Sequence, residues 1–135
     1  MANSDTVRSL QRYLSPESEH LLDWFHITMR LTVMTQMAKG MIMELAAQKK
    51  TKKEAHEIAS IDVPARLLTQ LESIKWHLWH GNATEALALI YDVNVDLEIW
   101  EENPTNKKKL LKLVCEFENY IRANGAFIPN YGERY

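Results

Sequence analysis

Two pairs of residues have a spacing that suits chemistry. Asp23 and His26, and likewise His77 and His80, lie three residues apart, so on a helix each pair would share one face and could approach a single ion. A carboxylate at the end of an apolar run often presents an acid to a metal or substrate, and the alternative for Asp23 is a helix N-cap. For the two histidines, interaction of the imidazoles with the negative end of a helix dipole is the simpler interpretation.

A cluster of four lysines could contact phosphate groups. It consists of Lys49, Lys50, Lys52 and Lys53. Such a cluster is typical of a solvated helix end or loop, and contact with the DNA backbone is the alternative.

Other catalytic templates are missing from the sequence. It has no Gly-rich phosphate loop, no Gly-x-Ser-x-Gly elbow and no His-Glu-x-x-His pair. Cys115 is the single cysteine, so an intrachain disulfide and a multi-cysteine zinc site are both excluded. Its apolar neighbours predict a buried, unreactive thiol.

The composition is that of one folded domain. The 135 residues are 46% hydrophobic and 25% charged, with a net charge of -2, so any nucleic-acid role must rest on local patches. No run approaches the ~20 apolar residues that a membrane-spanning helix needs, and the first residues do not resemble a secretion signal. We expect a cytoplasmic protein without a membrane partner.

Glycine and proline number only four each, which predicts a mainly α-helical fold. A short helix should follow Ser4-Asp5 and end at Ser15-Pro16, after which residues 20–25 could be a short buried strand or the start of the next helix. The next helix should bury Leu31, Met34, Ala38, Met41 or Ile42, and Leu45. Five of the six methionines lie in residues 29–43, where they could fill the core or form an adaptable partner surface.

Three further helices are predicted downstream. Asp62 and Pro64 should begin one helix that Gly81 ends, and Asn82 with Glu85 should cap the next. The helix capped by Asn82 should bury Ala86, Ile90, Val93, Leu97 and Trp100, and a last helix, which should end near residues 124–125, should bury Leu110, Val114, Phe117 and Ile121. The tail 126–135 is too short to be an element of its own and looks like a segment cut off in mid-structure. Acidic residues between 92 and 102 should pair with lysines between 107 and 112.

Four stretches resemble bacterial insertion-sequence transposases of the Kra group. Residues 18–30 read Ser-Glu-His-Leu-Leu-Asp-Trp-Phe-His-Ile-Thr-Met-Arg and resemble the D-x-x-H segment of that family. Residues 7–14 resemble the preceding helix, residues 75–81 (Lys-Trp-His-Leu-Trp-His-Gly) the tryptophan signature of a helical insertion, and residues 127–135 the stretch after it. The matches occur in the expected order over nearly the whole chain.

The resemblance implies a ribonuclease H-like nuclease core that holds two Mg²⁺ ions with three acids and is interrupted by a helical insertion. Residues 1–30 would then be a remnant of the core with a helix, a short strand and the D-x-x-H motif. Residues 31–125 would be the helical insertion, and residues 126–135 would start the return to the core. We therefore expect a mainly α chain with at most one or two short strands.

The chain departs from the family pattern in its acids. No segment for the first Asp precedes residue 1, and the sequence stops before the family's Glu; Glu133 matches an earlier position. The second acid belongs near Ser4-Asp5, which lacks the expected glycine, and in that alignment Asp23 and His26 form the accessory D-x-x-H motif. In the alternative alignment Asp23 is itself the second acid.

Together these features predict a transposase fragment that is inactive alone. In the intact parent the partner would be DNA at the transposon ends, with Mg²⁺ as cofactor. The alternative is a stand-alone helical interaction module or an oligomerising remnant, which would form a homo-oligomer through its methionine-rich surface.

Overall fold

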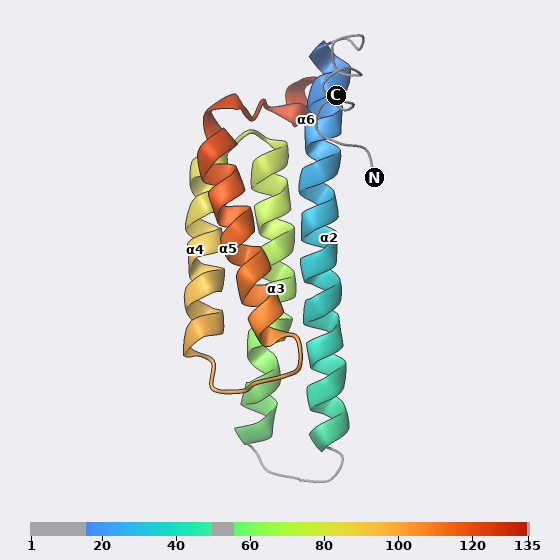
Figure 1. Cartoon of the computed structure of the whole chain (residues 1–135), viewed down its shortest axis with the longest axis vertical. Coiled ribbons are helices and arrows are strands. Elements are labelled where there is room, and N and C mark those ends of the chain that lie inside the picture. Colours follow the sequence, from blue (N-terminus) through green and yellow to red (C-terminus); the bar gives the residue numbers. More distant parts are fainter. Residues whose placement is uncertain (1–15, 50–55, 135) are drawn as a thin grey trace.

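The computed structural model describes residues 16–49 and 56–134. Four long helices run alternately up and down: α2 (Pro16–Lys49), α3 (His56–Trp79), α4 (Ala83–Ile99) and α5 (Lys107–Asn124) (Figure 1). A 3-10 turn, η1 (Gly125–Phe127), and the short α6 (Tyr131–Arg134) follow. The described residues contain no strand, so the prediction of a mainly α fold is confirmed.

The strand considered for residues 20–25 is wrong, because this stretch lies inside α2. Trp24, Ile27 and Leu31 continue the three-and-four spacing of the core-facing side of the helix, with Trp24 packed against the core and the other two buried. Nothing interrupts the helix between them. Pro16 is the first residue of α2, a position that suits a residue without a backbone N–H. The helix predicted within residues 1–15 lies outside the described residues.

The core side of α2 follows the predicted spacing. Leu31, Met34, Ala38, Met41 and Leu45 are all buried. Alternating steps of three and four residues keep one face of a helix against its partners. Two methionines of this helix are therefore core residues, whereas Met29 and Met43 are exposed.

The predicted start of α3 at Asp62 and Pro64 is wrong, because Pro64 lies inside a helix that already begins at His56. Proline removes one backbone hydrogen bond from a helix interior. The helix continues through it because Pro64 is itself buried and the following face is fully packed. That face consists of Leu67, Leu71, Ile74 and Leu78.

The turn between α3 and α4 confirms the predicted roles of Gly81 and Asn82. Gly81 has a φ of +75°. Its N–H donates to the carbonyl of Leu78 over 3.1 Å, and the N–H of Asn82 donates to the carbonyl of His77 over 2.8 Å. This is the Schellman pattern that ends a helix at a left-handed glycine. Asn82 then caps α4, because its Oδ1 accepts from the N–H of Glu85 over 3.2 Å.

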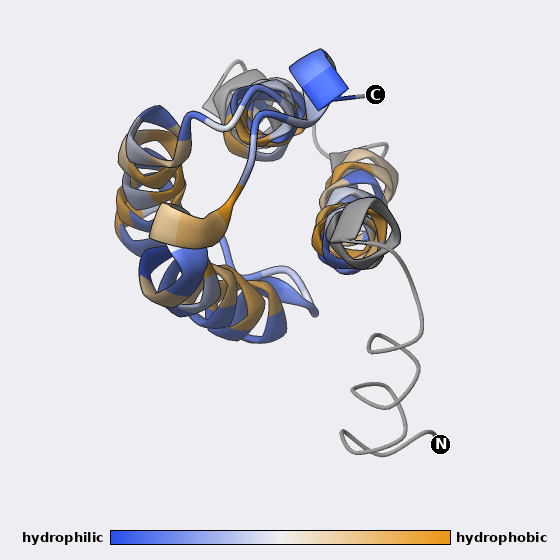
Figure 2. Cartoon of the chain, turned by 90° about the horizontal axis from the view of Figure 1, so that it is seen from above, coloured by the Kyte–Doolittle hydropathy of each residue, from blue (hydrophilic) through white to orange (hydrophobic). Residues whose placement is uncertain are grey.

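The buried faces of all four helices meet in one core. Seen from above, the helices surround a common interior toward which apolar segments turn (Figure 2). Ala86, Ile90, Val93 and Leu97 of α4 are buried, as predicted from their spacing. The last helix contributes Leu110, Val114, Phe117 and Ile121, also as predicted.

The predicted ion pairs between the acidic stretch and the lysines do not form among the described residues. Asp96 instead lies 3.5 Å from Arg66 and accepts a 3.1 Å hydrogen bond from Gln70, both on α3. Lys107 is buried, and its Nζ donates to the carbonyl of Trp100. This hydrogen bond offsets the cost of burying the Lys107 ammonium group.

A polar contact fastens the loop between α4 and α5 to α2. The Glu44 carboxylate accepts from the N–H of Thr105 over 3.0 Å and from its hydroxyl over 2.6 Å. These residues are sixty-one positions apart in sequence. The contact therefore positions the start of α5 relative to α2.

Replacing Glu44 with Ala should destabilise the fold by about 1–2 kcal/mol, because two hydrogen bonds to a charged group are lost. Urea denaturation followed by circular dichroism measures the change. Glu98→Ala removes an exposed glutamate from α4 and serves as the control. Equal stabilities of the two variants would show that the loop contact contributes nothing.

Candidate functional site

Three segments that are far apart in the sequence meet at one end of the bundle. Trp24 comes from α2, Trp79 from the end of α3 and Tyr131 from α6. The ring centroids lie 4.9 Å apart for Trp24 and Trp79, 5.1 Å for Trp24 and Tyr131, and 5.8 Å for Trp79 and Tyr131. Aromatic rings at such separations attract one another beyond their apolar burial. We call these three residues the aromatic junction.

The tail forms two short helices, so the prediction that it is too short to be an element of its own is wrong. The side chain of Tyr131 is fully buried, and residues 125–127 and 131–134 are both helical. A buried tyrosine contributes a large apolar area. The tail is thus anchored to the bundle.

Two glycines allow the backbone segments at this end to approach closely. A Cβ on Gly81 would lie 3.0 Å from the backbone nitrogen of Asn130, and a Cβ on Gly132 would lie 3.0 Å from both His80 Nδ1 and Trp79 Nε1. No ordinary side chain fits such gaps without displacement of a neighbour. The absence of a side chain at both glycines therefore lets the α3–α4 turn and the tail pack closely against each other.

Asp23 and His26 point to different surroundings although they lie one helical turn apart. Asp23 is half-buried and lines a small cavity of about 60 Å³ together with Tyr120, Asn124 and Tyr131. His26 is exposed, and its ring centroid lies 6.4 Å from that of Phe25. The structure therefore does not bring this pair together on one ion.

The described residues do not fit a two-metal centre. Among them, no three His, Cys, Asp or Glu side chains come together in a way that could hold an ion. Two-metal chemistry requires several converging carboxylates, and Asp23 is the acidic residue among those that line the small cavity at the junction. Of the two histidines at the end of α3, His77 is half-buried, whereas His80 is exposed and its ring stacks on Trp76 with the centroids 6.4 Å apart.

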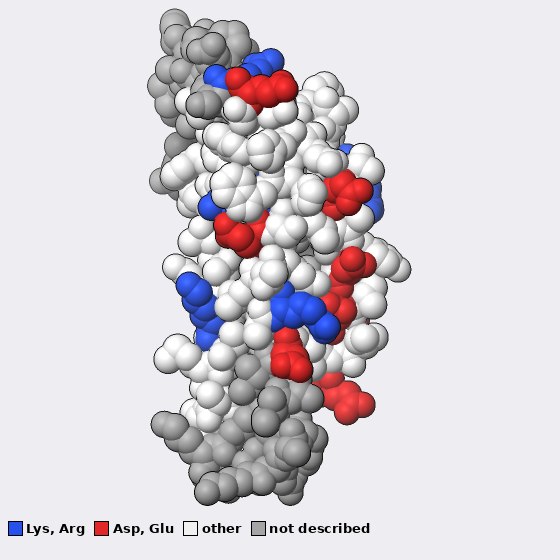
Figure 3. Space-filling view, turned by 180° about the vertical axis from the view of Figure 1, so that it is seen from behind, with Lys and Arg blue, Asp and Glu red and all other residues white. Residues whose placement is uncertain are grey.

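The lysine cluster falls largely outside the described residues. Lys49 is the last residue of α2, and Lys50, Lys52 and Lys53 lie in the part that the structure does not describe. On the face drawn in Figure 3, basic and acidic side chains alternate, without a continuous basic surface. Lys39 and Lys75 line a polar groove of about 260 Å³ between α2 and α3, but Glu72 lies beside them.

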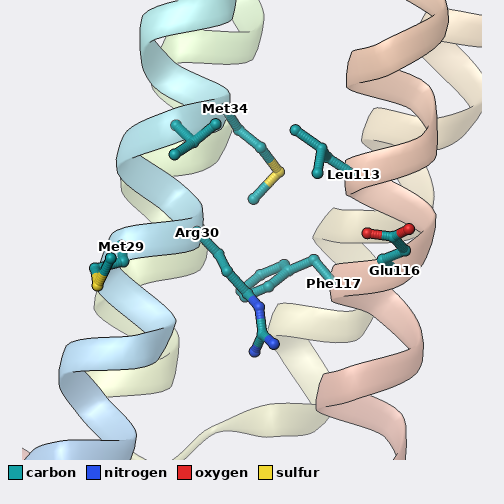
Figure 4. A pocket seen from close by; sticks show the side chains of 7 residues that line it. Met29, Arg30, Met34, Leu113, Glu116 and Phe117 are labelled. Carbon is teal, nitrogen blue, oxygen red and sulfur yellow. The ribbon is translucent and has the colours of Figure 1, made fainter. Parts of the chain in front are cut away.

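A second feature, an apolar groove between α2 and α5, was missed by sequence reasoning. Its cavity measures about 200 Å³, and Figure 4 shows the side chains around it. The lining residues are Met29, Arg30, Val33, Met34, Leu113, Glu116 and Phe117. The available signal was a second apolar row in α2, with one residue every four positions, beside the core-facing row.

The prediction of a buried Cys115 is wrong, because the residue is exposed. Its Sγ lies 3.5 Å from Oδ1 of Asn94. The thiol occupies the position next to the buried Val114, and one step along a helix turns a side chain by about 100°. An apolar neighbour in sequence therefore does not imply burial.

Comparison of the chain with protein-family models, with curated proteins and with solved structures finds no match. Within the described residues, no helix is both long enough and apolar enough to cross a bilayer. Function must therefore be argued from the residues and their geometry.

Replacing Gly81 with Ala should destabilise the protein by about 2 kcal/mol or more, because a Cβ is strained at positive φ and here also meets the backbone of the tail. Thermal unfolding measures the loss. The control is Gly40→Ala in the middle of α2, where a Cβ meets nothing within 4 Å and should stabilise the helix by about 0.5–1 kcal/mol. Similar effects at the two glycines would contradict the proposed fit of turn and tail.

Proposed function

We propose that this chain is the helical part of an insertion-sequence transposase, with short flanking pieces of the catalytic core. The observation that carries the proposal is the aromatic junction. Trp24 lies in the D-x-x-H stretch, Trp79 in the tryptophan stretch and Tyr131 in the closing stretch. Unrelated chance matches spread over the sequence would have no reason to converge in space.

The position of the two ends of the bundle supports the same proposal. In the first half of α2, Trp24 contacts Tyr131 of the short α6, with ring centroids 5.1 Å apart, and both elements lie at the same end of the bundle (Figure 1). A unit inserted into another domain must begin and end at neighbouring points, so that the host fold is not disrupted. The bundle meets this condition.

The proposed parent activity is DNA transposition with Mg²⁺, and the chain alone is proposed to be inactive. Asp23 belongs, in this proposal, to the accessory D-x-x-H motif, and it is one of the residues that line the small cavity at the junction. The acids that would hold the metals come from segments of the parent outside this chain. No catalytic step is assigned to the described residues.

The reading frame in its source genome tests the proposal directly. We expect coding sequence on both sides, with an Asp-bearing segment upstream and a Glu-bearing helix downstream in the same frame. Sequencing the flanking DNA settles this. Unrelated sequence with its own start and stop signals on both sides would refute the proposal for this chain.

The four lysines at positions 49, 50, 52 and 53 are proposed to contact phosphates. Their joint replacement with Ala should make the dependence of log K on log salt concentration shallower by about 3–4, since each phosphate contact contributes about 0.9. Fluorescence anisotropy with a duplex at several salt concentrations measures the slope. Replacement of the exposed Lys108, Lys109 and Lys112 on α5 is the control, and an equal change there would remove the cluster from the proposal.

A second candidate function is a helical interaction module, which the apolar groove between α2 and α5 favours. A solvent-accessible apolar cavity bordered by charged side chains is typical of a protein-binding surface. Here Arg30 and Glu116 border it. This candidate needs neither DNA nor metal.

A further inference from the structure

The outer surface of α2 carries a row of large apolar side chains that the core does not use. Leu21, Phe25, Met29 and Val33 are 44%, 57%, 52% and 42% exposed. Their four-residue spacing places them on one side of the helix. Water-exposed apolar residues that adjoin one another mark interaction surfaces, whereas scattered ones do not.

The groove between α2 and α5 adjoins this row and forms a cavity beside it. Met29 and Val33 belong to both the row and the groove wall, Leu113 lies on the opposite wall, and the buried Met34 and Phe117 form its floor. The volume is about 200 Å³. An apolar cavity of about 150 Å³ is sufficient to hold a benzene ring, so the groove can accept one phenylalanine side chain.

Phe25 supplies such a side chain on the same helix. The α2 wall of the groove spans residues 29–34. Phe25 lies about six residues before the middle of this wall, or about 10 Å along the helix. In a two-fold symmetric pair each contact occurs twice, with the partners exchanged. A two-fold axis crossing α2 near Met29 places each Phe25 at the groove of the other copy.

We propose that two copies of this chain form an antiparallel dimer through α2, with Phe25 of each copy inserted into the groove between α2 and α5 of the other. Met29 lies near the axis in this arrangement. The occupant of the groove is therefore a second copy. The inference concerns the chain itself and does not depend on the proposed transposase parent.

The charges beside the groove complement this arrangement. Arg30 lies on the α2 wall and Glu116 on the α5 wall (Figure 4). The Arg30 guanidinium carbon sits 4.1 Å from the centroid of the Tyr120 ring, which holds the cation at the groove. Within the part of the chain that the structure describes, Glu116 forms no ion pair. The two-fold axis places Arg30 beside Glu116 of the second copy, and this pair also occurs twice.

The first test is the molecular mass of the full chain, measured by sedimentation equilibrium between micromolar and hundreds of micromolar concentrations. We expect a dimer that dissociates on dilution. Phe25→Asp should weaken association at least tenfold, whereas the control Met43→Asp, on the same helix and 73% exposed in the wild type, should leave it unchanged. Circular dichroism confirms that each variant is folded.

Charge exchange tests the register of the two helices. Arg30→Glu and Glu116→Arg should each weaken dimerisation several-fold, and the double variant should recover most of the loss. A disulfide provides a second readout that does not depend on affinity. In a Cys115→Ser background, Met29→Cys should form a cross-linked dimer on mild oxidation, whereas Met43→Cys should not.

Three outcomes would overturn the proposal. The first is a monomer at all concentrations tested, and the second is a dimer that Phe25→Asp does not weaken. The third is a monomer that dimerises only after removal of residues 1–15, which would identify that segment as the occupant of the groove. All three leave the transposase proposal untouched, because the genomic test of that proposal does not involve dimerisation.

Discussion

The bundle depends on the aromatic junction, where the first and the last described segments of the chain contact each other. Trp24 near the start of α2, Trp79 at the end of α3 and Tyr131 in α6 pack together. The left-handed backbone of Gly81 lets the α3–α4 turn press against the tail at this point. Three segments far apart in sequence are thereby held in one place by ring packing and by one backbone conformation that glycine alone adopts easily.

The same junction explains why the groove between α2 and α5 exists. At one end α2 contacts the segment after α5 through the junction, and at the other end Glu44 contacts Thr105 in the loop before α5. Between these points α2 packs mainly on α3, and Arg30 contacts Tyr120 of α5 near the middle. Because α2 and α5 are held together near their ends and pack sparsely between them, the interface between these helices has room for a side chain from another molecule.

The aromatic junction and the groove lie at different positions along α2. The aromatic junction brings Trp24 of α2 beside Tyr131 of the tail, so the first and last described segments of the chain meet at one place. The middle of α2 offers a self-complementary apolar surface with a charge on each wall of its groove. The two features use different sides of α2, since Trp24 packs against the core whereas Phe25 is exposed.

The sequence by itself determined that four long helices occur in the described part and which residues form most of their buried faces, but not the short helices of the tail. Regular spacing of residues such as Ala38, Ile90 and Phe117 reports burial directly, because a helix presents one face to the core. The glycine and asparagine at 81 and 82 likewise identified their turn, since the required backbone conformation and side-chain acceptor are local properties. The start of α3 was misplaced because tertiary packing carried the helix through Pro64, against a local signal.

Only the tertiary structure decided which motif residues meet and which face solvent. Periodicity could not show that Asp23 turns toward a cavity while His26 is exposed, nor that Tyr131 is buried. It also could not reveal the groove, which depends on the distance in space between α2 and α5, two helices that are not neighbours in the sequence. Local spacing describes one helix at a time, whereas distances between helices follow from the combined packing of all of them.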